Sequence, residues 1–82
     1  MDLREVFAAN LRRLRHNKGL SQEDLAYLAD INRTYISKLE KGISYPGLEI
    51  IGKLASVLGI VPAELLKLPA KRQKSIRIKR LA

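Results

Sequence analysis

Apolar residues recur at every third or fourth position along most of the chain, which is the pattern of helices that bury one face. The first stripe consists of Leu3, Phe7, Leu11 and Leu14. We expect the helix that carries it to end at 17–19, because Gly19 suits the left-handed conformation that follows many helices. Leu20 supplies the hydrophobic contact that often accompanies such an end.

Two short helices are predicted next, joined by a connection of about three residues. Ser21 is a good N-cap, and Asp24 stands three residues later, as in a capping box. The helix that Ser21 begins is expected to end at Ala29. Asp30 tolerates a positive φ angle and Asn32 can cap the following helix, so a short turn suffices.

The following helix is predicted over 33–41 and is closed by Gly42, which gives a helix-turn-helix over 21–42. The inward side of the two helices consists of Leu25, Ala26, Ala29, Ile36 and Leu39. A connection this short makes the helices cross steeply and leaves one face of the second helix projecting outward.

Two further helices complete an all-α fold of five helices. The fourth is expected to begin near Gly47 and to stop at Gly59. Its apolar stripe consists of Leu48, Ile51, Leu54, Ala55 and Leu58. Pro62 suits the first position of a short fifth helix that reaches about Lys67.

The composition excludes several classes of protein. The chain has 82 residues, no Cys and one His, which rules out disulfides, thiol chemistry and cysteine-based zinc modules. His16 has no acidic cluster around it with which to build a metal site.

No apolar run approaches the roughly 20 residues of a membrane span, and the N-terminus lacks a signal-peptide layout. We expect a cytoplasmic protein without cofactor, metal or small-molecule ligand. An enzyme is not expected, because paired carboxylates and a glycine-rich phosphate loop are both missing.

The net charge of +8 is distributed unevenly. A domain is predicted over 1–69, where ten Lys and Arg face eight Asp and Glu, whereas the basic extension over 70–82 holds six Lys and Arg and no acid. The nearly balanced domain cannot bind a nucleic acid by charge alone, so it must gather its basic groups on one face. The extension is open to three interpretations: a solvated tail, a phosphate-contacting arm, or a dimer element formed by the alternation around Ile76 and Ile78.

The outer face of the third helix has the chemistry of a DNA-reading surface. Its residues are Arg33, Thr34, Ser37, Lys38 and Lys41. All of them donate hydrogen bonds, and none is acidic or large and apolar. A helix face of this kind fits the major groove, where base edges are read and flanking phosphates are contacted. A merely solvated face would be expected to include some Asp or Glu.

The sequence resembles the Cro/lambda-repressor (Xre) family of helix-turn-helix regulators. The resemblance is carried by LSQEDLA at 20–26 and INRTYISKLEKG at 31–42, continues through 46–58 and 62–66, and covers roughly residues 5–67. RTYIS at 33–37 is similar in particular to controller proteins of restriction–modification systems. The resemblance implies a five-helix lambda-repressor-like domain.

The resemblance also implies roles for single residues. Arg33, Thr34 and Lys38 match base-reading positions. The positions expected to contact the DNA backbone are Gln22, Asn32, Ser37, Lys41 and Tyr45. Tyr35 either touches DNA or packs on the second helix. Arg15 and Glu40 match a family ion pair that, when buried, fixes the angle of the recognition helix.

A short recognition helix reads only a few base pairs, so a homodimer on a palindromic operator is expected, with half-sites about 34 Å apart. Four aliphatic residues lie off the predicted core stripes and form a candidate dimer patch: Ile50, Val57, Val61 and Leu65.

Three positions depart from the family pattern. Asp30 replaces the usual turn glycine, Val61 stands where a capping residue is expected, and Gly52 lies within a helix. The predicted function is a sequence-specific regulator of transcription that places the helix at 33–41 in the major groove of double-stranded DNA. The alternative is an antitoxin-like protein-interaction module that uses the same fold and the extension as a docking segment.

Overall fold

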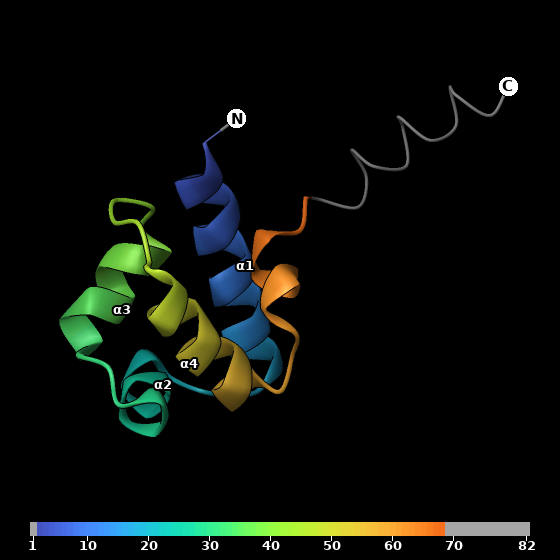
Figure 1. Cartoon of the computed structure of the whole chain (residues 1–82). Helices are drawn as coiled ribbons and strands as arrows, with labels where there is room; N and C mark the ends of the chain where they lie inside the picture. Colours follow the sequence, from blue (N-terminus) through green and yellow to red (C-terminus); the bar gives the residue numbers. More distant parts are fainter. Residues whose placement is uncertain (1, 69–82) are drawn as a thin grey trace, which may run out of the picture.

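The computed structural model of the chain describes residues 2–68 and is all-helical over that range (Figure 1). Its elements are α1 (Leu3–Asn17), α2 (Gln22–Ala29), α3 (Arg33–Glu40), α4 (Leu48–Leu58) and a 3-10 helix η1 (Pro62–Leu66). Four α-helices were therefore predicted at the right places, whereas the fifth element is a 3-10 helix rather than an α-helix. The extension predicted over 70–82 lies outside the described residues.

The helices begin and end where the local sequence signals place them. Ser21 and Asp24 form the complete capping box of α2. Gly19 has φ 74° after the end of α1, and Asp30 adopts the left-handed conformation with φ 57° at the end of α2. The side chain of Asn32 accepts a hydrogen bond from the Thr34 amide at 2.7 Å and so caps α3. These signals act within a few residues, so the sequence alone is enough to predict them.

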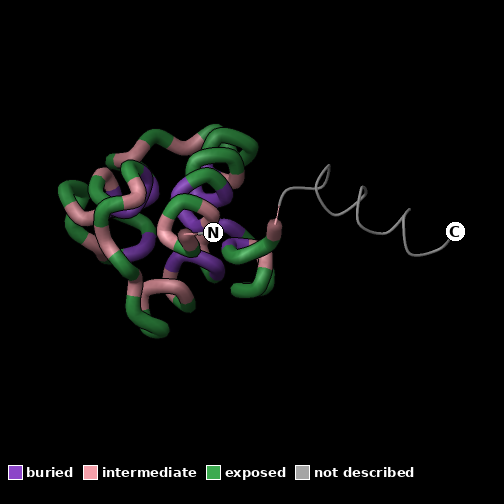
Figure 2. The backbone as a smooth tube through the Cα atoms, turned by 90° about the horizontal axis from the view of Figure 1, so that it is seen from above, coloured by how far each residue is buried: buried purple, intermediate pink, exposed green. Residues whose placement is uncertain are grey.

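The elements wrap around one apolar core (Figure 2). Helix α1 packs against α3 and η1, and α2 packs against α3 and α4. The side chains with the least exposure are Phe7, Leu11, Leu25, Ile36, Leu39, Leu54 and Leu65. Figure 2 shows the buried segments gathered toward the middle of the domain, with exposed segments around them.

Three apolar residues lie elsewhere than predicted. Leu3 and Leu48 were assigned to buried stripes but are 51% and 87% exposed, because each is the first residue of its helix. Leu65 was assigned to the dimer patch but is completely buried. That assignment grouped Leu65 with Val61 as aliphatic residues off the predicted core stripes. However, Val61 has extended backbone angles at the start of η1, so the two side chains do not share an α-helical face.

The buried side chain of Asn10 attaches η1 to α1. Its amide nitrogen donates hydrogen bonds to the carbonyl oxygens of Leu65 and Lys67, both at 2.9 Å. Asn10 was not among the residues predicted from the sequence to have a role. The available signal was its spacing: Asn10 lies three residues after Phe7, on the side of α1 that turns toward the core.

The burial of Leu65 predicts a clear difference between two neighbouring leucines. Leu65→Ala should lower the free energy of unfolding by about 2–5 kcal/mol, because it leaves a cavity in the core. Leu66→Ala, at a side chain that is 41% exposed, should cost less than about 1 kcal/mol. Chemical denaturation of both variants measures the difference, and equal losses would contradict the assignment of Leu65 to the core.

Candidate nucleic-acid interface

The outer face of α3 exposes three of its polar residues. Arg33, Thr34 and Lys38 are exposed, while Ile36 and Leu39 on the opposite side are completely buried. The hydrophobic side of α3 therefore fixes the helix on the body, and the predicted base-reading side chains point away from the core. This follows from the 3.6-residue period of the helix.

The residues predicted to contact the DNA backbone lie on both sides of this face. Asn32 and Lys41 are exposed at the two ends of α3, and Ser37 is half-buried. The side-chain oxygen of Asn32 already accepts a hydrogen bond from the Thr34 main-chain amide. The side-chain nitrogen of Asn32 is therefore the group that can donate to a phosphate.

The loop after α3 is held by two aromatic contacts. The Tyr35 hydroxyl donates a hydrogen bond to the carbonyl oxygen of Tyr45 at 3.2 Å, and Tyr35 also packs against the core. The Arg4 guanidinium lies 4.6 Å from the centre of the Tyr45 ring, a cation–π geometry. Tyr45 itself is 68% exposed, so its ring remains on the surface.

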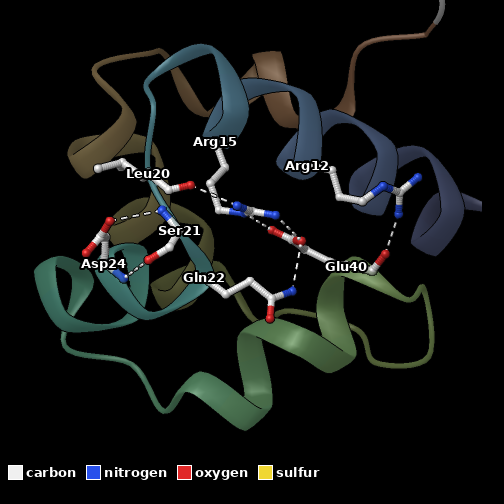
Figure 3. A network of polar contacts seen from close by, with 7 residues as sticks. All are labelled: Arg12, Arg15, Leu20, Ser21, Gln22, Asp24 and Glu40. Atoms are coloured by element: carbon white, nitrogen blue, oxygen red, sulfur yellow. Dashed lines mark hydrogen bonds and ion pairs between the residues drawn. The ribbon is translucent and has the colours of Figure 1, made fainter.

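The expected ion pair between Arg15 and Glu40 is present and joins α1 to the end of α3 (Figure 3). Arg15 Nε donates to Glu40 Oε2 at 2.6 Å, and Arg15 Nη2 donates to Glu40 Oε1 at 2.9 Å. Arg15 Nη1 donates to the Leu20 carbonyl oxygen at 2.8 Å. Arg15 is only 8% and Glu40 only 4% exposed, so each buried charge must be compensated by the other rather than by water.

Gln22, which is predicted to contact the DNA backbone, lies in this network. Its Nε2 donates to Glu40 Oε1 at 3.1 Å, which adds α2 to the contact between α1 and α3 (Figure 3). Arg12, to which the sequence analysis gave no role, donates to the main-chain carbonyl oxygen of Glu40. Arg12 precedes Arg15 by three residues, so the two arginines share a face of α1, and that spacing was the signal that pointed to it.

These contacts set the charge of the α3 surface. Burial of Glu40 would raise the pKa of its carboxyl, but the hydrogen bonds from Arg15 and Gln22, with the charges of Arg15 and Arg12, outweigh burial and lower the pKa. The hydrogen bond to Glu40 also raises the pKa of Arg15. Glu40 is the only acidic residue in α3 and is buried, so the exposed charges of that helix are positive.

The candidate dimer patch is reduced to three residues. Val61 is 62% exposed, whereas Ile50 and Val57 are partly buried and pack against the core. Leu65 belongs to the core, as described above.

Residues 2–68 offer neither a metal site nor a membrane span. That part of the chain brings together no group of three His, Asp or Glu side chains able to hold a metal ion. It also has no helix with the length and apolar content needed to cross a membrane.

The lowered pKa of Glu40 predicts an acid-dependent contribution to stability. The contribution is complete above the usual value of 4.5 and is lost as the pH falls through the lower pKa of the folded state. Glu40→Gln should therefore reduce the free energy of unfolding on the order of 2 kcal/mol at neutral pH. The difference from the parent chain should shrink toward zero as the pH falls below 4.5 and through the lower pKa of the folded state.

Denaturant unfolding at several pH values measures this difference. The variant has to be compared with the parent chain at each pH, because Asp24 in the capping box makes its own acid-dependent contribution to stability. Hydrogen bonds with Ser21 lower the pKa of Asp24. This contribution is the same in the parent chain and in Glu40→Gln, so it cancels in the difference. A difference independent of pH would contradict the ionised pair.

Comparison with known proteins identifies relatives of the chain. The family model described as "Helix-turn-helix" (HTH_3) matches residues 11–66. A hypothetical transcription factor of Neisseria meningitidis serogroup B is 44% identical over 73 residues, which cover 89% of this chain and 69% of the relative. The control protein C.BamHI of Bacillus amyloliquefaciens is 39% identical over 66 residues, which cover 79% of this chain and 82% of the relative.

Solved structures agree with these sequence relatives. The crystal structure of the hypothetical transcription factor NHTF from Neisseria has a TM-score of 0.82 at 44% identity, covering 89% of this chain and 84% of that one. The restriction-modification controller protein C.AhdI from Aeromonas hydrophila has a TM-score of 0.74 at 45% identity, covering 76% of this chain and 94% of that one. The chain therefore belongs to the Xre-like helix-turn-helix (HTH_3) family, whose members related to it include restriction–modification control proteins.

Proposed function

We propose that the protein is a transcriptional regulator that binds double-stranded DNA with sequence specificity and inserts α3 into the major groove. The observation that carries the proposal is the outer face of α3. It exposes Arg33, Thr34 and Lys38, while the one carboxylate of the helix is buried against Arg15. A surface with donors and no exposed acid suits guanine edges and phosphates.

The relatives support this choice over an antitoxin-like interaction module. Three of them carry the names of a transcription factor, a control protein and a restriction-modification controller protein. In the proposal, Arg33, Thr34 and Lys38 read bases. The residues that contact the DNA backbone are Asn32, Ser37, Lys41 and Tyr45. Gln22 joins the second group by moving its amide from Glu40 to a phosphate. Selection of binding sites from a random DNA pool tests the proposal directly, and recovery of no preferred sequence would reject it.

A two-fold homodimer completes the proposal, since the eight residues of α3 offer base contacts over only a short stretch of one groove. Ile50, Val57 and Val61 are the candidates for the dimer surface, and a palindromic operator is the expected target. Two copies related by a two-fold axis would place one α3 in each half-site.

Arg33→Ala tests the base-reading role. Loss of a bidentate contact to guanine should reduce the preference for the selected sequence by about 1–3 kcal/mol, roughly 5- to 150-fold, while weak salt-dependent binding persists. Fluorescence anisotropy with the selected duplex and single-base variants measures the preference. Lys18→Ala is the charge-matched control, because Lys18 lies at the end of α1 with its ammonium beside Gly59. A preference retained in full by Arg33→Ala would contradict the assignment.

Val61→Asp tests the dimer surface. Val61 is exposed and precedes η1 without a side-chain cap, so an aspartate there is compatible with the folded monomer. A charge buried between two subunits should raise the dimer dissociation constant about tenfold or more, which sedimentation analysis measures. Tyr27→Asp, at an 85% exposed position on α2, is the control. Equal dissociation constants for both variants would place the dimer surface elsewhere.

A further inference from the structure

The C-terminal end of α3 is completed by a residue from another helix. The last four carbonyl groups of an α-helix have no partner within the helix. The chain after α3 supplies amides for three of them, with bonds from Lys41 to Ser37, from Gly42 to Leu39 and from Ile43 to Lys38. The fourth carbonyl, that of Glu40, accepts its hydrogen bond from Arg12 Nη1 of α1.

Arg12 and Arg15 thus hold the same residue of α3 in two different ways (Figure 3). Arg15 binds the carboxylate of Glu40, which lies at the end of a flexible side chain. Arg12 binds its main-chain oxygen, which moves rigidly with the helix. Contacts at two separate points restrict the rotation of α3 as well as its position. A guanidinium is also favoured at this end by the helix dipole.

A helix of eight residues has little stability of its own, so its direction depends on tertiary contacts. The buried side of α3 fixes its depth through Ile36 and Leu39. Arg12 is exposed and contributes no apolar surface to the core. Its contact with Glu40 is therefore separable from the folding of the domain.

We propose that Arg12 is a positioning residue: through the carbonyl of Glu40, it sets the direction of α3 and so the fit of Arg33 and Thr34 to base edges. The inference rests on the proposed function, because the direction of α3 matters for discrimination only if α3 reads DNA. Arg12 acts through α3 and need not touch DNA itself.

The experiment compares Arg12→Met with Arg13→Met. Arg13 is the matched control, because it is exposed and carries the same charge. Its Nη2 donates a hydrogen bond to Asn10 Oδ1 of the same helix at 3.0 Å and not to α3. Arg12→Met should lower the preference for the selected duplex over single-base variants about fivefold or more, since misaligned bidentate contacts lose their discrimination. Arg13→Met should leave that preference unchanged within about twofold, although both variants lose equal charge.

Amide hydrogen exchange on the free protein provides a second readout. Without Arg12, the amides of Lys41, Gly42 and Ile43 should exchange about fivefold faster, because the end of α3 opens more often. Arg12→Lys, which restores a charged donor, should recover part of both effects. Core amides of α4 should exchange at the parent rate, which separates this result from general destabilisation.

The outcomes separate the two proposals. Equal preferences for Arg12→Met and Arg13→Met, in a chain whose parent discriminates between duplexes, would overturn the role of Arg12 alone. Unchanged exchange at the end of α3 would overturn it as well. A parent chain that shows no preference among duplexes would overturn the proposed function, and with it the positioning of α3 for reading.

Discussion

The structure depends on the neutralisation of one carboxylate, that of Glu40. It lies on the helix whose outer face carries Arg33 and Lys38, and a free carboxylate there would oppose a polyanion. Burial removes it from that face, but a buried carboxylate is costly unless it is paired and hydrogen-bonded. Arg15 supplies two hydrogen bonds and Gln22 a third, so the requirement of a single charge brings α1, α2 and α3 together at one point. Since each of these helices also contributes to the core, the packing and the charge of the surface are determined together.

Most helix boundaries could be predicted because their causes are local. The capping box at Ser21, the cap at Asn32 and the left-handed turns at Gly19 and Asp30 each involve contacts within a few residues. Only four of the five predicted helices are α-helices, and the pair between Arg15 and Glu40 was inferred from family resemblance rather than from spacing. Nothing in the local sequence of either residue specifies a partner 25 positions away.

The predictions failed where the sequence identified the face of a helix but not the element that packs against that face. A period of three or four residues identifies which side chains point the same way, and only the tertiary structure decides whether another element covers them. Leu48 continues an apolar stripe beyond the reach of the core and is therefore exposed. Leu65 was grouped with Val61 among aliphatic residues off the core stripes, but η1 begins after Val61 and Leu65 is completely buried. Asn10 and Arg12 were missed for the same reason, because their acceptors are carbonyl oxygens of distant elements, and any residue type supplies those.

The two ends of α3 are completed in different ways. At the N-terminal end the Asn32 side chain satisfies an amide from within the chain, so no other element has to cover that end. At the C-terminal end α1 and α2 close on Glu40 and occupy the surrounding space. Arg33 and Thr34 are exposed in the first turn of α3, and Lys38 and Lys41 are exposed toward its other end. The contacts that complete both ends and bury the carboxylate therefore leave the proposed base-reading residues accessible along the outer face.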